Sequence, residues 1–428
     1  MSQFGRRGEA LFDRRRLLCG LATGAAATLL GGRASQAGSV PTRQALNEQN
    51  PHFNVIPGGD SPAPPIDPMS ASEPLLSLAT LQATERAVGQ YEAIVGRGGW
   101  PRIAPGDTPQ LGMRHPNVAA LRQRLLDGGD LVGGSEGSDV YDANVEAAIR
   151  RFQTRHGFAA DGQVRESALS ALNVSAQVRL AQLRTNLSRL RAFGGLTAPR
   201  MVVCNIAAAQ VEAVESDAVV ARYTAVVGKP DRPSPELQSK IFQVNFNPYW
   251  TVPTSIVKHD LMPKMMVEPD YLSKNHIRVL DGRGREVIAQ HIDWASERPL
   301  GYRLRQDPGD FNSLGAIRIN FRNPHQVYMH DTPLKNLFDE NFRFDSSGCV
   351  RVQNIRALAE WLLSPVPGWS PSGIDQVIKA GERKDARVAP AVPLCWTYVT
   401  AWATADGVVQ FRDDIYSRDG VGAYATRT

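Results

Sequence analysis

The sequence predicts a multidomain α+β protein in which a helical N-terminal half precedes a β-rich C-terminal half. The chain has 428 residues, enough for two or three domains whose cores need no disulfide support. Between residues 111 and 172, apolar residues recur at the spacing of one helix face. After residue 200, short β-rich runs are separated by turn signals, which indicates a β-dominated domain.

Residues 1–37 have the pattern of a secretory signal peptide. Three arginines, Arg14 to Arg16, precede a charge-free apolar run from Leu17 to Leu30, and Ser35 to Ala37 suits signal peptidase. The apolar run is too short to cross a hydrocarbon core of ~30 Å, and the paired arginines favour twin-arginine export. We therefore expect a periplasmic protein with no membrane span after signal removal. An uncleaved anchor and a lipoprotein attached through Cys19 are the alternatives.

The charge distribution gives little support to a nucleic-acid partner. The formal net charge is +5, but residues 1–37 hold six arginines against two acidic residues, a surplus of +4. The rest of the chain therefore carries only about +1, without the basic footprint that nucleic-acid binding needs.

The helical half divides into four segments. Residues 38–70 are polar and Pro-rich, which predicts a disordered linker, and residues 71–110 form a helical segment that includes Leu75 to Val95. Residues 111–173 predict a small three-helix domain, and residues 174–195 a connecting helix. The three short helices are expected at Pro116 to Leu126, Tyr141 to His156 and Arg165 to Leu172.

The β-rich half, residues 200–418, has strand patterns at both ends. Strands are expected at Met201 to Ile206, Val211 to Val214 and Tyr223 to Val227, with a helix at Asn354 to Leu363. A hairpin is expected between Trp396 to Ala403 and Val408 to Phe411, around Asp406-Gly407. Residues 254–312 are long for a loop, so we expect a lid or capsule over the cleft; the alternative is an insertion without a role in substrate binding.

Two of the four cysteines, Cys204 and Cys395, lie in apolar strand-like runs. The simplest interpretation is that each is a small buried hydrophobic residue. An oxidising compartment leaves open that they pair with each other.

Cys349 differs because it follows Ser346-Ser347-Gly348 in a turn, 19 residues after His330. A thiol of pKa near 8.5 needs a partner such as an imidazole to become a nucleophile at neutral pH. Gly348 allows a tight turn, whose backbone N–H groups can stabilise an oxyanion. The pattern indicates acyl transfer through a thioester. A Cys/His metal site is disfavoured because no second Cys or His lies at ligand spacing.

Several motifs in order resemble two known families. The helical module is similar to the peptidoglycan-binding domain 1 family. The β-rich half resembles the L,D-transpeptidase catalytic domain of the YkuD family, in its periplasmic YcbB-like branch. The residues that carry the first resemblance are Val118 to Leu125, Tyr141-Asp142, Ile149 to Gln153, His156 to Phe158 and Asp161-Gly162. Those that carry the second are Val226 to Pro235, Phe246 to Pro253, His330 to Pro333 and Ser346 to Val352.

The resemblance implies roles for the site residues. It implies Cys349 as the nucleophile, His330 as the general base, and the backbone of Gly348 and Cys349 as part of an oxyanion hole. Ser347 stands where the family commonly has a histidine, which leaves His330 as the single candidate base. Arg351 either binds a substrate carboxylate or anchors the turn. The other expected substrate-binding residues are Tyr328, Asn247, Tyr249 and Trp250.

The implied substrate is the stem peptide of peptidoglycan. The resemblance implies attack on the carbonyl of meso-diaminopimelate in a tetrapeptide, release of the terminal D-Ala, and transfer to the amine of another diaminopimelate as a 3→3 crosslink. It implies no metal or organic cofactor and acylation by carbapenem-type inhibitors. The alternatives are an L,D-carboxypeptidase, a transferase that tethers a lipoprotein to the wall, and a non-catalytic peptidoglycan-binding scaffold.

Overall fold

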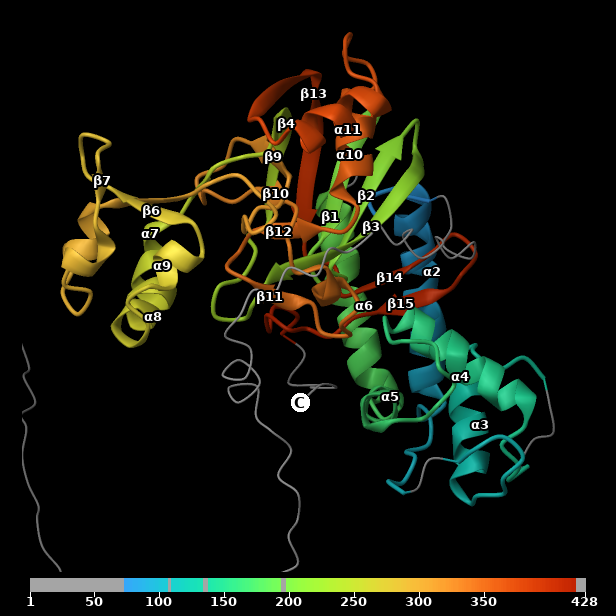
Figure 1. Ribbon diagram of the computed structural model, residues 1–428. Helices are drawn as coiled ribbons and strands as arrows, with labels where there is room; N and C mark the ends of the chain where they lie inside the picture. The colour runs from blue at the N-terminus through green and yellow to red at the C-terminus, as the bar shows by residue number, and fades with distance from the viewer. Residues whose placement is uncertain (1–72, 107–108, 134–137, 194–197, 421–428) are drawn as a thin grey trace, which may run out of the picture. The chain divides into compact units, whose positions relative to one another are not determined.

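The computed structural model describes residues 73–106, 109–133, 138–193 and 198–420 (Figure 1). The predicted signal peptide and the linker at residues 38–70 lie outside the described residues. Within the described ranges, no helix is both long enough and apolar enough to cross a membrane.

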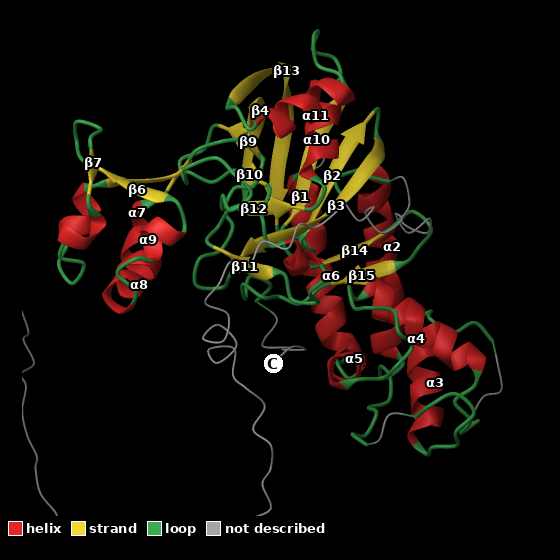
Figure 2. Cartoon of the chain, viewed as in Figure 1, coloured by secondary structure: helices red, strands yellow, loops and turns green. Residues whose placement is uncertain are grey.

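Helices dominate the first part of the described chain, and strands dominate the rest (Figure 2). Side-chain caps fix three helix starts, where Ser77, Asp142 and Ser175 each accept a backbone N–H from the first turn. The predicted helices are confirmed, with ends that differ by a few residues. Their bounds are α2 Leu78–Gly96, α3 Asn117–Asp127, α4 Ala143–Arg155, α5 Glu166–Leu172 and α6 Ala176–Ala192.

The helices α3, α4 and α5 share one apolar core, as predicted for the three-helix module. Leu121, Leu125, Ile149, Phe152 and Leu172 are almost completely buried in it. Full burial of such side chains contributes about 1.5–3 kcal/mol each, which is how helices of 7 to 13 residues remain folded.

A buried arginine of the module, which forms an ion pair within it, also contacts the C-terminal part of the chain. Arg155 at the end of α4 contacts Asp130 at 2.6 Å, and both side chains are about 95% buried. The Nη1 group of Arg155 also donates to the carbonyl of Val409 at 3.2 Å, and Arg412 donates to the carbonyl of Arg155 at 2.9 Å. The module is therefore packed against the rest of the fold by one buried and one partly buried hydrogen bond.

The main sheet has nine strands in the order β11-β3-β12-β10-β9-β4-β13-β1-β2. An additional β2–β3 pairing closes eight of them on themselves, which gives a barrel-like β domain. The strands are β1 Arg200–Asn205, β2 Gln210–Glu215, β3 Ala218–Gly228, β4 Leu237–Phe246, β9 Ile317–Phe321, β10 Met329–His330, β11 Phe344–Ser346, β12 Val350–Val352 and β13 Lys384–Thr397.

The two faces of this sheet have different apolar partners. The helices α10 Ile355–Leu363 and α11 Pro371–Ala380 cover one face around Trp396 (Figure 1). Cys204 faces this core, whereas Cys395 belongs to a second core with Met201 and Leu190. Because β1 and β13 pair Val203 with Cys395, the two thiols point to opposite faces, and both are free. The alternative that they form a disulfide is therefore wrong, and both are buried small hydrophobic residues.

Residues 254–312 fold into helices and strands with a core of their own. A four-stranded sheet in the order β5-β8-β6-β7 packs with Leu261, Met265 and Leu272 from the helical part. The elements are β5 Trp250–Thr251, α7 Thr254–Ile256, a π-helical turn Val257–Leu261, α8 Met262–Val267, α9 Tyr271–Lys274, β6 Ile277–Leu280, β7 Glu286–Val287 and β8 Arg303–Gln306.

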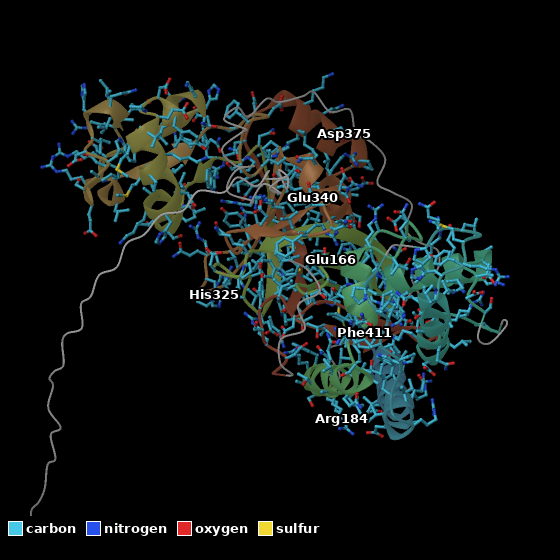
Figure 3. All side chains as sticks on the ribbon, turned by 90° about the horizontal axis from the view of Figure 1, so that it is seen from below. Glu166, Arg184, His325, Glu340, Asp375 and Phe411 are labelled. Atoms are coloured by element: carbon cyan, nitrogen blue, oxygen red, sulfur yellow. The ribbon has the colours of Figure 1, made fainter. Side chains whose placement is uncertain are left out.

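The predicted C-terminal hairpin is shorter than expected. Only β14 Ala401–Ala403 and β15 Val409–Phe411 pair, because Trp396 and Thr397 belong to β13. Phe411, labelled in Figure 3, packs against Tyr91 of α2 and His156 of the module, so the hairpin links the helices to the module.

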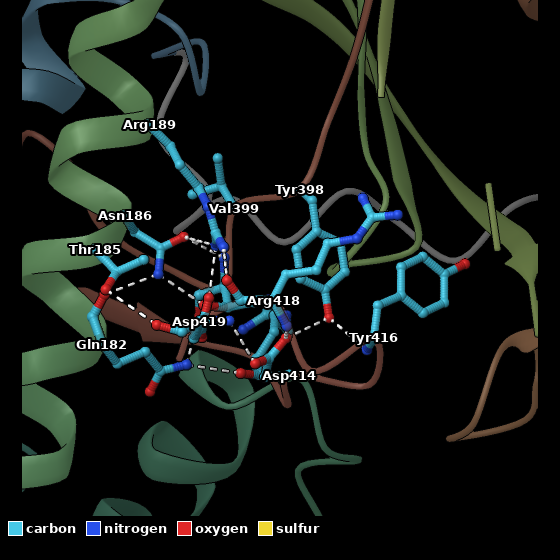
Figure 4. Close-up of polar contacts among 12 residues, drawn as sticks. Gln182, Thr185, Asn186, Arg189, Tyr398, Val399, Asp414, Tyr416, Arg418 and Asp419 are labelled. Carbon is cyan, nitrogen blue, oxygen red and sulfur yellow. Dashed lines mark hydrogen bonds and ion pairs between the residues drawn. The ribbon is translucent and has the colours of Figure 1, made fainter. Parts of the chain in front are cut away.

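Polar side chains hold the segment after β15 against α6 (Figure 4). Asn186 of α6 accepts from the backbone N–H of Thr400 and donates to its hydroxyl at 2.7 Å. The carboxylate of Asp419 accepts from Thr400 and from Arg189, both at 2.6 Å. These contacts hold Asp419, together with Thr400 between β13 and β14, against α6.

Candidate active site

Two adjacent parallel strands bring the predicted nucleophile and base together. His330 ends β10, and Cys349 immediately precedes β12. The register pairs Met329 with Val350 and His330 with Arg351. His330 and Cys349 are 19 residues apart in sequence, but the neighbouring strands β10 and β12 bring them close together in space.

The turn that carries Cys349 is fixed by serine hydroxyls. Gly348 has a φ of +107°, a region that side chains rarely adopt, so this position requires glycine. Ser346 Oγ accepts the N–H of Gly348 at 3.1 Å and donates to the carbonyl of Cys349 at 2.5 Å. The hydroxyl of Ser234 donates to the carbonyl of Gly348 at 2.9 Å.

These bonds correct the prediction for the oxyanion hole. The N–H of Gly348 is committed to Ser346, so it is not available to a substrate oxyanion. Among the hydrogen bonds of the described residues, the backbone N–H of Cys349 has no acceptor. Of the two predicted donors, this structure leaves only the N–H of Cys349 for a developing negative charge.

The thiol of Cys349 lies in a partly buried site against Tyr328. Burial is the largest influence and raises the pKa of the thiol to about 11. The backbone N–H and the hydroxyl of Tyr328 both hydrogen-bond the sulfur, and Arg351 and Arg318 lie near it; these four influences favour the thiolate. Cys349 is therefore a neutral thiol at rest, in surroundings that stabilise negative charge once it forms.

His330 is held as a neutral imidazole. Its Nδ1 group donates to the carbonyl of Asp331 at 2.5 Å, which leaves Nε2 with a free lone pair. Burial, followed by the positive charge of Arg351, lowers the pKa of His330 to about 3. Asp331 itself is fixed by Lys335 at 2.5 Å and by the backbone N–H of Ala316.

A neutral thiol beside a neutral imidazole is suited to nucleophilic attack with the imidazole as general base. Since neither group is charged at rest, the proton leaves the thiol of Cys349 as the sulfur attacks, and His330 can accept it on Nε2. The described residues contain no group of three or more His, Cys, Asp or Glu side chains that could hold a metal ion. The arrangement fits acyl transfer through a thioester.

The remaining predicted residues divide into two groups. Trp250 hydrogen-bonds the hydroxyl of Tyr328, and Ser347 accepts a bond from Arg232, so both belong to the surroundings of the thiol. Asn247 instead donates its side-chain amide to the carbonyls of Val377 and Glu382, which is a contact within the fold.

Tyr249 is 36% exposed and lies under the guanidinium of Arg305 at 4.3 Å. Arg351 is placed beside His330, and its buried Nε and Nη1 atoms have no hydrogen-bond partner among the residues that the structure describes. The structure therefore gives Arg351 no role in anchoring the turn through those two atoms.

Two arginines that were not among the predicted site residues also belong to the site. Arg318 of β9 pairs in register with His330 on the side opposite to Arg351. Arg232 contacts Asp260 of the π-helical turn at 2.5 Å and donates to Ser347 at 3.1 Å, so it connects the insertion to the nucleophile turn.

Family models match two parts of this chain. Residues 199–380 match the L,D-transpeptidase catalytic domain of the YkuD family. Residues 114–172 match a family described as "Putative peptidoglycan binding domain". The first match contains the whole site described above, and the second coincides with the three-helix module.

Known proteins show the same likeness. A "Putative L,D-transpeptidase" of Haemophilus influenzae is 32% identical over 239 residues, 56% of this chain and 48% of the relative. The match thus spans about half the length of that relative. An L,D-transpeptidase from Xylanimonas cellulosilytica has 15% identity and a TM-score of 0.24, covering 69% of this chain and 99% of that one. An L,D-transpeptidase in complex with imipenem has 16% identity and a TM-score of 0.21, with 46% and 59% covered.

Proposed function

We propose that this protein crosslinks peptidoglycan stem peptides through a thioester on Cys349. Its chain carries a peptidoglycan-binding domain followed by an L,D-transpeptidase catalytic domain of the YkuD family. The donor is a tetrapeptide stem and the acceptor is the side-chain amine of a second diaminopimelate, which gives a 3→3 crosslink. The narrower assignment to the YcbB-like branch stays a prediction.

The described geometry supports each step of such a reaction. The sulfur of Cys349 attacks the carbonyl of diaminopimelate while His330 Nε2 accepts the thiol proton, and the backbone N–H of Cys349 faces the developing oxyanion. As the peptide bond breaks, the same proton passes to the departing D-Ala amine. The acceptor amine then attacks the thioester, His330 takes its proton, and the C–S bond breaks as the new amide forms; the same proton returns to the sulfur and regenerates the thiol of Cys349.

The observation that carries the proposal is the neutral imidazole on the strand beside the nucleophile turn. His330 is 5% exposed, its Nδ1 is occupied by Asp331, and its Nε2 is the only ring nitrogen left to act as a base. Tyr328 adds two hydrogen bonds to the sulfur, which is how a buried thiol of raised pKa is helped to lose its proton.

Mass spectrometry of muropeptides tests the proposal directly. Isolated sacculi incubated with the purified protein should gain 3→3 crosslinked dimers, and Cys349→Ala should abolish them. Cys395→Ala is the matched control, because this buried thiol faces a core without a base and affects stability only. Loss of crosslinking in a folded Cys395→Ala protein would contradict the assignment of the nucleophile.

The same assay separates the alternatives. Tripeptides that accumulate without dimers would indicate a carboxypeptidase, in which water accepts the acyl group. Transfer only to an added lipoprotein amine would indicate a wall-tethering enzyme. Unchanged muropeptides with wild-type protein would indicate a scaffold that binds peptidoglycan without chemistry.

The cellular setting is part of the proposal. We place the reaction in the periplasm because residues 1–37 have the features of a signal peptide. The three-helix module would raise the local concentration of polymeric substrate at the site, since both lie on one chain. Carbapenem-type β-lactams would acylate Cys349, because the thiol lies in a site suited to acyl transfer.

A further inference from the structure

Two arginines flank the base of the site in one row across three strands. The register pairs Arg318 of β9 with His330 of β10, and His330 with Arg351 of β12. Alternation places the neighbours Ile317, Ile319, Met329, Val350 and Val352 in the apolar core on the other face. Arg318 and Arg351 therefore lie on the same face of the sheet as His330.

Among the described residues, neither guanidinium has a carboxylate within ion-pair distance; Asp345 acts on Arg351, and Asp385 on Arg318, only at longer range. The Nε and Nη2 groups of Arg318 donate to the side-chain oxygen of Asn245, at 3.0 and 2.8 Å, which is a neutral acceptor. Asp385, the carboxylate next along the row, is occupied by Asn245 and Arg383. The Nε and Nη1 groups of Arg351 are buried and have no acceptor within the described part of the chain.

Two partly buried positive charges with no carboxylate in direct contact are costly, because charges at longer range offset only part of the desolvation. Guanidinium groups bind carboxylates in a fork geometry that matches both oxygens. Both charges also lie near the thiol of Cys349, where the substrate must bind. The arrangement is thus complete only when an anion is bound next to the reacting carbonyl.

We propose that Arg318 is a specificity-determining residue that, together with Arg351, binds a free carboxylate of the donor stem peptide. The inference rests on the proposed function, since a stem peptide supplies such a group. Two sources share this chemistry: the carboxylate of the terminal D-Ala, and the carboxylate at the side-chain end of diaminopimelate. A stem amidated at the bound position is a poor donor.

Carboxylate binding has a consequence for the base. Four charged or titratable groups face His330. They are Arg318 of β9, Arg351 of β12, Cys349 just before β12, and Tyr328 just before β10. The two cations disfavour a proton on His330, and a bound carboxylate offsets them. The substrate therefore makes the imidazole a stronger base as it binds.

Calorimetric titration of the full chain carrying Cys349→Ala tests the inference separately from turnover. The probes are the disaccharide tetrapeptide, its D-alaninamide form, and its form amidated at diaminopimelate. The free acid should bind about 10- to 100-fold more tightly than one of the two amides, and that amide identifies the carboxylate held. With Arg318→Met added, this preference should disappear, whereas Arg318→Lys should restore part of it.

Arg322→Met is the matched control, because this exposed arginine lies four residues along the chain and forms no ion pair among the described residues. It should leave the acid preference unchanged. Equal binding of all three probes would overturn the inference, as would an equal loss for all three in Arg318→Met, which a purely structural role predicts. Acid-selective binding without turnover in the wild type would instead count against crosslinking and leave the carboxylate site standing.

Discussion

Removal of one buried hydroxyl, in Ser234→Ala, should weaken both the fold and the nucleophile turn. Ser234 has no exposed surface and lies in the loop between β3 and β4. Its hydroxyl accepts the backbone N–H of Gly228 at 2.9 Å and donates to the carbonyl of Gly348 at 2.9 Å. Alanine would leave both backbone groups buried without partners.

The size of the effect follows from these two lost bonds. A buried polar group left unpaired costs about 1–3 kcal/mol, so two of them cost about 2–6 kcal/mol. A single missing oxygen atom leaves too little space for a water molecule to replace the hydroxyl. Activity should fall as well, because the carbonyl of Gly348 would no longer fix the N–H of Cys349.

Urea unfolding at a constant m-value measures the loss of stability. Ser239→Ala is the matched control, since its hydroxyl makes one bond to the carbonyl of Arg322 at 2.7 Å at an exposed position. We expect the control to lose less than about 1 kcal/mol. If Ser234→Ala lost no more than Ser239→Ala, the role assigned to the buried hydroxyl would be refuted.

Three further predictions concern the site. A carbapenem should add one adduct to the wild type and none to Cys349→Ala by intact-mass analysis, and an adduct on the variant would place the nucleophile elsewhere. Arg232→Met and Asp260→Asn should each slow this acylation several-fold, and the double variant should be no slower than the worse single one, because both remove the same contact; additive effects would contradict this. The free energy of unfolding should fall as the pH drops from about 6.5 toward 3, because the unfolded chain takes up a proton that His330, with a pKa of about 3, does not. His330→Gln should flatten this decline, and parallel curves for the two proteins would show that His330 is not the group responsible.

Helical periodicity was sufficient to predict the N-terminal half, but strand patterns were not sufficient for the sheet. The strand β13 spans Lys384–Thr397 and includes Pro390 and Pro393, residues that normally argue against a central strand. A shift of register between Arg387 and Val392 accommodates Pro390, and both prolines precede Leu394, where pairing with β1 begins, so the strand is paired on one side only at these positions. No local pattern in the sequence predicts that the strand tolerates these two prolines.

The candidate site shows the same division. Cys349 and His330 stand in motifs whose residue types carry the chemistry, so the sequence indicated them. Arg318 was missed because Ile317, Ile319 and Phe321 alternate with polar residues, a pattern typical of a strand with one solvated face. Only the pairing of β9 with β10 places Arg318 beside His330, and local sequence patterns do not predict the order of strands in a sheet.

The central position of β13 also determines when the protein can finish folding. Its partner β1 begins at Arg200, and Asn186 of α6 bonds Thr400, which is 214 residues further along the chain. At a synthesis rate of about 5–20 residues per second, the earlier strand waits roughly 10–40 s on the ribosome for its neighbour. During that interval its hydrogen-bonding edge and the apolar surface around it are open to other chains. The β domain must therefore be shielded until its last strands emerge, and a chain cut short before β13 remains permanently in that exposed state.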